Sequence, residues 1–114
     1  MTAASEPIGT TIIGLEEQMR GWLAAIAKER QPRRQVAAYR ELYRLFEFFS
    51  HLHIALFDDR AVAKYDELRS SGVRIGTMDL KMASIALVNS AKLLTANKRD
   101  FEKVPGLEFE NWLD

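Results

Sequence analysis

Apolar positions near the start of the chain change from an extended to a helical spacing. Residues 10–13 are two threonines followed by two isoleucines and predict a strand, and nothing before them predicts another. Apolar residues then recur at helical intervals, which predicts a helix that follows this strand directly. These residues are Leu15, Met19, Trp22, Leu23 and Ile26.

A second helix is predicted to begin near Pro32, because proline suits the first turn of a helix. Its apolar stripe consists of Val36, Tyr39, Leu42, Tyr43, Phe46 and Phe49. We interpret this largely aromatic stripe as part of the hydrophobic core. The alternative interpretation is a surface on which nucleic-acid bases stack.

The middle of the chain predicts a short strand and a third helix. Residues 53–57 are largely apolar and predict a buried strand. Asp58 or Asp59 can cap the helix that follows, and Gly72 suits the left-handed end of that helix. The apolar positions of the helix are Ala61, Tyr65 and Leu68.

The last third of the chain predicts one buried helix and two strands. Residues 78–88 are apolar on nearly all sides, which is typical of a helix surrounded by protein. Residues 91–95 and 107–109 predict strands, with a turn at Pro105 and Gly106 between them. Strands separated by helices imply crossover connections. We therefore predict a single α/β domain over residues 1–114, with a mostly parallel sheet flanked by helices.

The chain contains no cysteine, and its formal net charge is +0. Disulfides, thiolate metal sites and a cysteine nucleophile are therefore excluded, and the molecule as a whole has no strong field for nucleic acid or anionic membrane. No apolar run reaches the length that spans a bilayer, and the first residues lack the pattern of a signal peptide. We expect a cytoplasmic protein with no membrane partner.

Basic residues are concentrated around the start of the second predicted helix. Six of them stand against two acidic residues between Lys28 and Arg44. Two interpretations remain open: the segment is the solvated face of a helix, or it holds a phosphate backbone. The candidate RNA contacts are Arg30, Arg33 and Arg34.

Residues 73–76 predict a further short extended segment. Three carboxylates stand shortly after predicted strands or, for Asp79, after this segment, where ligands bind in open parallel sheets, namely Glu17, Asp79 and Asp100. Converging carboxylates without thiolates suit a hard cation such as Mg²⁺ or Mn²⁺, which could serve a displacement at a phosphodiester. Structural interpretations exist as well, with Glu17 as an exposed helix residue and Asp100 as a turn cap. For Asp79, the structural interpretation is support of a helix start that Thr77 caps.

Two segments of the sequence resemble the C-terminal half of VapC-like PIN domains. They are residues 74–83 (RIGTMDLKMA) and residues 93–101 (LLTANKRDF), followed by VPGL at residues 104–107. Upstream, residues 17–21 (EQMRG) are similar to the helix in which this family has an acidic ligand four residues before a glycine, which selects Glu17 over Glu16. The resemblance runs from near Thr10 to the C-terminus.

The resemblance implies a metal-dependent endoribonuclease, a toxin that is neutralised by a small antitoxin encoded beside it and that pairs as a homodimer. It makes Asp79 the chief metal-site carboxylate, with Asp100 and Glu17 completing the acidic pocket around Mg²⁺ or Mn²⁺. Thr77 and Asn97 would support that pocket through hydrogen bonds. The alternative function is a non-catalytic PIN-like module that binds an antitoxin or RNA.

The sequence departs from the family at its beginning, so that the fold is expected to be N-terminally truncated. The family starts with a central strand that carries a first catalytic aspartate, and the residues before Thr10 supply neither. The explanations are a start assigned too late, a decayed remnant, or a partner that supplies the strand. Without that strand we expect two half-sheets with unpaired inner edges, and a poor nuclease.

Overall fold

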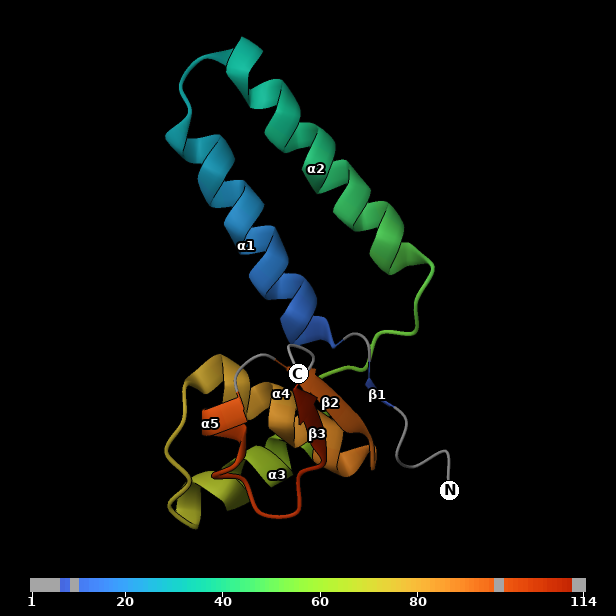
Figure 1. The fold of residues 1–114 in the computed structure, drawn as a ribbon, viewed down its shortest axis with the longest axis vertical. Coiled ribbons are helices and arrows are strands. Elements are labelled where there is room, and N and C mark those ends of the chain that lie inside the picture. Colours follow the sequence, from blue (N-terminus) through green and yellow to red (C-terminus); the bar gives the residue numbers. More distant parts are fainter. Residues whose placement is uncertain (1–6, 9–10, 96–97, 112–114) are drawn as a thin grey trace.

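The structure is a computed structural model that describes residues 7–8, 11–95 and 98–111 (Figure 1). In chain order its elements are β1 (Pro7–Ile8), α1 (Ile12–Lys28), α2 (Pro32–Ser50), α3 (Asp59–Ser70), α4 (Thr77–Val88), β2 (Lys92–Thr95), α5 (Lys98–Phe101) and β3 (Phe109–Asn111). The described chain is mostly helical, and its sheet is small. Among these residues, no helix combines the length and the apolar character needed to cross a membrane.

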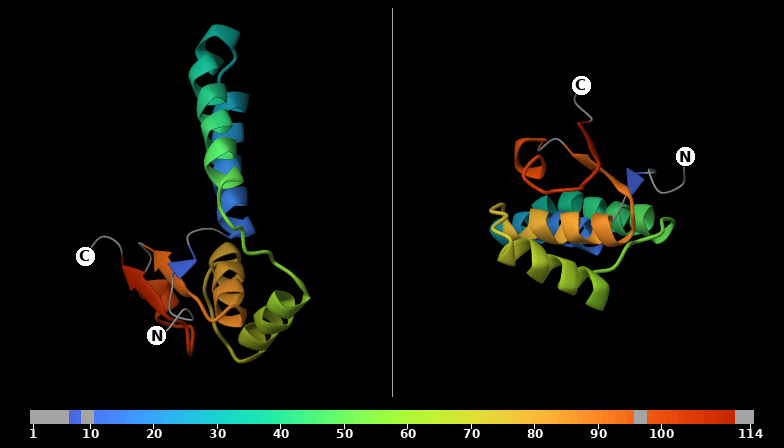
Figure 2. Two further views of the ribbon diagram at one scale, coloured as in Figure 1. Left: turned by 90° about the vertical axis from the view of Figure 1, so that its right-hand side faces the viewer. Right: turned by 90° about the horizontal axis from the view of Figure 1, so that it is seen from below.

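Two parts can be distinguished in the fold. α1 and α2 pack against each other as a hairpin that projects from the body formed by the other elements (Figures 1 and 2). This projection gives a radius of gyration of 16.0 Å, whereas a compact domain of this size has about 13 Å. The hairpin meets the body at its base, where α1 contacts α4. Most of its length therefore has no cover from the other described elements.

The body is built in layers around α4. This helix lies between α3 on one side and the sheet on the other (Figure 2). Leu80, Ala83, Ile85 and Ala86 are all fully buried, which confirms the predicted burial of this apolar helix. Ser84 is buried as well, and its hydroxyl donates a hydrogen bond to the Leu80 carbonyl at 2.8 Å. The one polar side chain buried in this helix is thus satisfied.

The three described strands form a sheet in the order β1-β2-β3, and both pairings are parallel. β1 lies directly beside β2, with Pro7 opposite Lys92 and Ile8 opposite Leu93. The prediction of two half-sheets with unpaired inner edges is therefore wrong, as is the prediction that no strand precedes Thr10. The pairing satisfies backbone groups that an open inner edge would leave without partners. The sequence predicts a larger sheet with helices on both faces. The described residues contain only this short, three-stranded part of it.

The predicted strand at residues 10–13 is wrong for its second half, which belongs to α1. Thr11 itself is extended and forms an isolated parallel bridge with Ala55. Thr11 also caps α1, because its Oγ1 accepts a hydrogen bond from the Gly14 amide at 2.9 Å. The cap and the helix it starts outweigh the β propensity of the two isoleucines that follow.

Two other predicted strands differ from the structure. The strand predicted at residues 53–57 is reduced to the bridge at Ala55, whose carbonyl accepts a hydrogen bond from the Ile12 amide at 2.8 Å. The last strand, predicted at residues 107–109, begins at Phe109 instead. The predicted burial of residues 53–57 is also wrong for most of them, because Ala55 is buried but Leu56 is 59% exposed.

Three predicted helix ends are confirmed. Pro32 is the first residue of α2. Asp58 caps α3, because its Oδ1 accepts a hydrogen bond from the Ala61 amide at 3.0 Å. Gly72 follows α3 with a φ of 96°, the left-handed conformation that glycine adopts at low cost.

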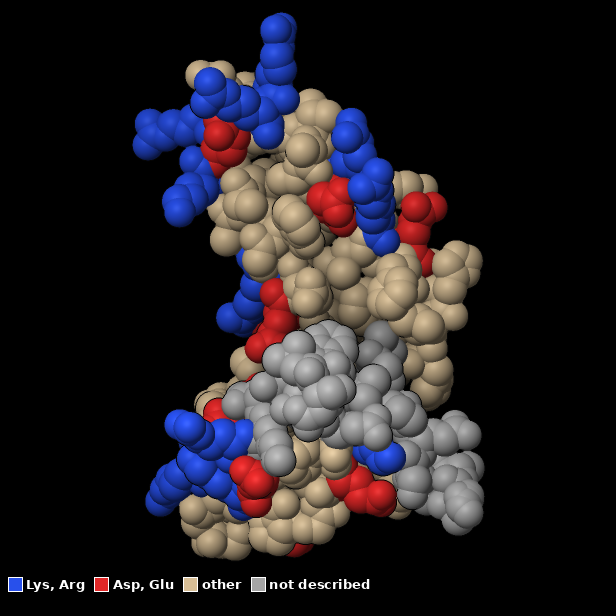
Figure 3. All heavy atoms as spheres, viewed as in Figure 1, with Lys and Arg blue, Asp and Glu red and all other residues tan. Residues whose placement is uncertain are grey.

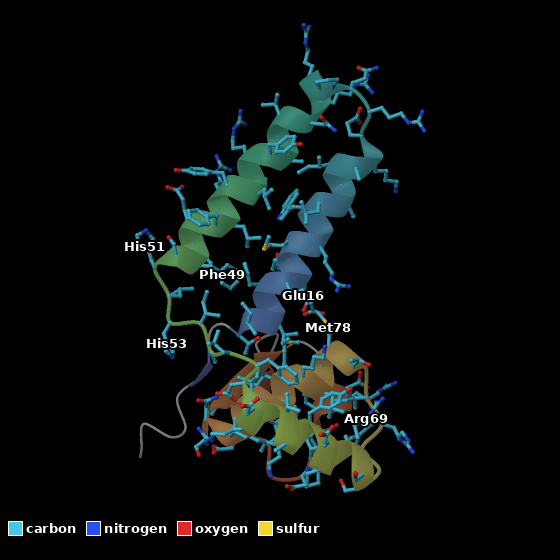
Figure 4. All side chains as sticks on the ribbon, turned by 180° about the vertical axis from the view of Figure 1, so that it is seen from behind. Glu16, Phe49, His51, His53, Arg69 and Met78 are labelled. Atoms are coloured by element: carbon cyan, nitrogen blue, oxygen red, sulfur yellow. The ribbon has the colours of Figure 1, made fainter. Side chains whose placement is uncertain are left out.

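The prediction that the aromatic stripe of α2 belongs to the core is wrong for most of its members. Phe49 is buried at the base of the hairpin (Figure 4), but Tyr43 and Phe46 are 59% and 67% exposed. Val36 and Tyr39 are also more than half exposed. The main neighbour of α2 is α1, and a single helix cannot cover so wide an apolar arc.

Candidate active site

An apolar cluster fixes the start of α1 against α4. Ile13 of α1 and Ile85 of α4 are buried in the same cluster, and Met78 packs against it. Figure 4 shows the first turns of α1 above the start of α4, where Glu16 and Met78 are labelled. Polar residues one turn beyond Ile13 therefore come close to the first turn of α4.

Asp79 stands in that first turn of α4 and is half-buried. The prediction that Thr77 caps the helix is wrong, because the cap is Gly76 and Thr77 is already helical and exposed. The positive end of the helix dipole favours a carboxylate at this position. Asn97, the other residue predicted to support the site, lies outside the described residues.

Glu17 of α1 lies within the electrostatic field of Asp79. The pKa of Glu17 is raised above its ordinary value of 4.5. Loss of water around the carboxylate contributes most to this shift, followed by the negative charge of Asp79 and then that of Glu16. Glu17 as a whole is still exposed, so the loss of water is partial and the group stays accessible. Two of the three predicted carboxylates are thus brought together.

Asp100 stands on α5, which the buried Phe101 anchors to the core. Its Oδ1 lies 3.8 Å from Nζ of Lys103, and its side chain is 33% exposed. Within the described part of the chain, no group of three or more histidine, cysteine, aspartate or glutamate side chains is arranged to hold a metal ion. Asp100 is therefore not gathered with Glu17 and Asp79 into a single cluster.

The donor chemistry of Glu17 and Asp79 suits a hard cation. Both offer carboxylate oxygens, and a bound cation would relieve the repulsion between the two negative charges. Mg²⁺ is commonly bound through one or two carboxylates while it keeps several waters, and Mn²⁺ prefers the same oxygen ligands. The pair therefore fits either ion.

Basic side chains gather at the tip of the hairpin, far from the body (Figure 3). Lys28 ends α1, and the three candidate RNA contacts Arg30, Arg33 and Arg34 follow it, all of them exposed. None of these four forms an ion pair with another described residue. Glu29 is the acidic residue among them. The tip thus carries net positive charge although the whole chain is neutral.

An apolar groove between the two hairpin helices has a volume of about 270 Å³. This groove was not predicted from the sequence. It is lined by Leu15 and Met19 of α1 and by Leu42, Leu45, Phe46 and Phe49 of α2. The sequence does contain a signal for this groove. The apolar residues of α2 cover more of the helix circumference than one neighbouring helix can bury.

Comparison with known proteins identifies a protein family and similar sequences. A family model described as "PIN domain" matches residues 2–107. The chain is 39% identical over 69 residues to a protein from Rickettsia felis named Ribonuclease VapC2, covering 57% of this chain and 52% of that protein. It is 28% identical over 83 residues to a protein from Salmonella typhimurium named tRNA(fMet)-specific endonuclease VapC, covering 69% and 63%. The chain thus spans about half to two thirds of the length of these curated relatives.

The fold is also similar to a solved structure described as VapBC2 from Rickettsia felis bound to a DNA fragment from their promoter. The TM-score is 0.63 and the sequence identity is 30%, over 90% of this chain and 72% of that chain. Most of the fold described above therefore has a counterpart in that structure.

Proposed function

This chain belongs to the PIN-domain family, and on that premise we propose that it is a cytoplasmic, metal-dependent endoribonuclease toxin. The observation that carries the proposal is the electrostatic coupling of Glu17 on α1 with Asp79 on α4. The proposed substrate is RNA, and the proposed inhibitor is a small antitoxin protein. Both relatives that match in sequence are named as nucleases, which supports phosphodiester cleavage.

In this proposal, Glu17 and Asp79 hold a Mg²⁺ or Mn²⁺ ion through their carboxylate oxygens, and Asp100 completes the acidic site. When bound, the ion supplies polarisation of a phosphoryl oxygen and a lowered pKa of bound water. Partial burial and the charge of Asp79 raise the pKa of Glu17 in the absence of the ion, and a bound cation would lower it and keep both carboxylates ionised. Thr77 and Asn97 support the site through hydrogen bonds, as the family resemblance implies.

The test is Mn²⁺-dependent cleavage of single-stranded RNA by the purified chain and by matched variants. We expect slow cleavage, because Asp100 is not gathered with Glu17 and Asp79 into one cluster in the described residues. Asp79→Asn should abolish this cleavage. Asp66→Asn, which changes an exposed carboxylate on α3, should cleave like the parent chain. Equal cleavage by the two variants would overturn the assignment.

The exposed apolar surface of the hairpin favours a second function, which is binding of a protein partner. Tyr43 and Phe46 are mostly exposed beside the 270 Å³ groove, and contiguous apolar surface of this kind usually marks an interaction site. The solved neighbours from Rickettsia felis and Salmonella typhimurium are described as VapBC. We propose that the groove receives the apolar face of an antitoxin helix.

Two outcomes would change this assignment. If the hairpin surface instead joins two copies of this chain, sedimentation of the chain alone should show a homodimer that Phe46→Ser dissociates. If antitoxin or RNA binding occurs without cleavage, and neither Asp79→Asn nor Asp100→Asn alters it, the chain is a non-catalytic binding module.

A further inference from the structure

A shallow hollow lies on the flank of α1 next to the carboxylate pair. It is lined by Glu17, Gln18, Gly21, Trp22 and Ala25. Its volume of about 300 Å³ is at the lower end of the range for small-molecule sites. Glu17 forms one end of the hollow and also interacts with Asp79. The hollow therefore adjoins the proposed cation site.

The side chains around the hollow suit a nucleobase. Trp22 is half-buried and contributes an aromatic surface, and the exposed Gln18 carries an amide that can pair with a base edge. A Cβ placed on Gly21 would meet nothing within 4 Å, so the space above this residue is open. An accessible aromatic surface is the feature on which proteins stack the bases of single-stranded nucleic acids.

The basic tip of the hairpin lies farther along the same face of α1. Lys28 follows Glu17 by about three helical turns, which places it on the same side of the helix and about 16 Å away along the axis. Arg30 and Arg33 extend the positive charge beyond it. A ligand that crosses the hollow from the carboxylate pair to the tip must therefore carry negative charge at the tip and a flat ring at Trp22. Single-stranded RNA has both.

We propose that the hollow at Trp22 is a nucleobase subsite and that single-stranded RNA runs along α1 from the Glu17–Asp79 pair toward the basic tip. This inference rests on the proposed function, because it takes RNA as the substrate of the same site. Stacking on Trp22 positions the strand so that a neighbouring phosphate lies at the carboxylates. Bases within a duplex are stacked on one another and cannot enter, so the subsite selects unpaired RNA.

The direct test is the fluorescence of Trp22. The chain has two tryptophans, so the Trp112→Phe background makes Trp22 the sole indole, and Asp79→Asn prevents cleavage during the titration. A short single-stranded RNA should quench this fluorescence. The same strand with abasic sites keeps its phosphates but lacks ring faces, and should quench much less. Equal quenching by both strands, or no quenching at saturating RNA, would overturn the subsite.

Affinity gives a second, independent test. Trp22→Ala removes the aromatic surface and Gly21→Leu fills the hollow while the indole stays, so each should weaken RNA binding about 5- to 150-fold. Ala27→Leu adds the same side chain on the opposite flank of α1 and should bind normally. Because Trp22 is half-buried, Trp22→Ala also removes packing contacts. Trp22→Phe keeps an aromatic ring at this position and should retain most of the affinity for RNA. Equal affinities of Gly21→Leu and Ala27→Leu would contradict the proposal.

The results distinguish this inference from the proposed function. Mn²⁺-dependent cleavage that is lost in Asp79→Asn, together with unchanged Trp22 fluorescence, would support the nuclease and overturn the subsite. Base-dependent quenching that Gly21→Leu abolishes, without any cleavage by the parent chain, would support the subsite and overturn the nuclease.

Discussion

Glu17 of α1 and Asp79 of α4 lie close enough to interact, so that the charge of Asp79, after partial loss of water, is the second cause that raises the pKa of Glu17. Apolar packing accounts for their proximity, because Ile13, one turn before Glu17, shares a buried cluster with Ile85 of α4. Two like charges are thus held near each other by neighbouring apolar side chains, at an electrostatic cost. Protonation or a bound cation relieves this cost, and the first two predictions depend on it.

Glu17 should make the folded chain less stable as the pH rises above 4.5. Because its pKa is raised on folding, the native state binds more protons than the unfolded chain between pH 4.5 and the folded pKa. The favourable contribution of Glu17 is complete below that window and is lost as the pH rises through it. Glu17→Gln should therefore gain stability relative to the parent near neutral pH, and less in acid. Urea unfolding at both pH values measures this, and a pH-independent difference would contradict it.

Divalent cations should stabilise the parent chain more than its Asp79 variant. A ligand that binds only the folded state at 100 times its Kd adds about 2.7 kcal/mol to the free energy of unfolding. Asp79→Asn should lose most of this gain, whereas Asp66→Asn should keep it. Thermal unfolding with and without Mn²⁺, reversed by a chelator, provides the measurement. A gain of the same size in all three proteins would exclude Asp79 as a ligand.

The cap of α3 gives a prediction for the body of the fold. Asp58→Ala should lower the free energy of unfolding by about 1 kcal/mol, because it removes the acceptor of the Ala61 amide at 3.0 Å. Ala61 is fully buried, so its amide has little access to replacement water. Asp66→Ala, on the exposed face of the same helix, should change stability by less. Denaturant unfolding of the two variants tests the difference.

Local signals predicted the helices better than the strands. Pro32 at a first turn and Asp58 at a cap act within a few residues, so the sequence alone locates α2 and α3 closely. The strands are short, and their pairing joins distant segments, as between Ile8 and Leu93. No local pattern determines which segments pair, and at Thr11 the signal for a helix cap competed with a β-branched run.

The candidate site was predicted in part for a similar reason. Position after predicted strands and family motifs selected Glu17 and Asp79, but their mutual interaction depends on how α1 packs against α4. The hairpin shows that a predicted apolar face need not be a buried one. Helical spacing identified the apolar face of α2, but it could not show that Tyr43 and Phe46 on this face stay mostly exposed.

The basic tip should determine the salt dependence of RNA binding. Each phosphate contact on a single strand contributes about 0.7 to the slope of log affinity against log salt concentration. Changing both Arg33 and Arg34 to glutamine should therefore reduce that slope by about 1.4. Arg44→Gln is the control, because Arg44 is already paired with Glu41 at 2.6 Å. An unchanged slope in the double variant would place the RNA elsewhere.

Phe46 and Phe49 should respond to substitution in opposite ways, although they lie one turn apart on α2. Phe49 is 8% exposed, so Phe49→Ala should lower the free energy of unfolding by about 3 kcal/mol. Phe46 is 67% exposed, so Phe46→Ala should change the stability of the isolated chain by about 0.5 kcal/mol at most.

Phe46 should matter more for binding of the proposed antitoxin than for the stability of the isolated chain. Phe46 lines the apolar groove, and its loss should weaken the complex because an exposed aromatic ring at a groove is a typical anchor of an interface. Calorimetric titration of the antitoxin into the parent chain and into Phe46→Ala measures this. Val62→Ala, an exposed apolar residue on α3, is the matched control. If Phe46→Ala and Val62→Ala bind equally well, the hairpin surface does not receive the antitoxin and another partner must cover it.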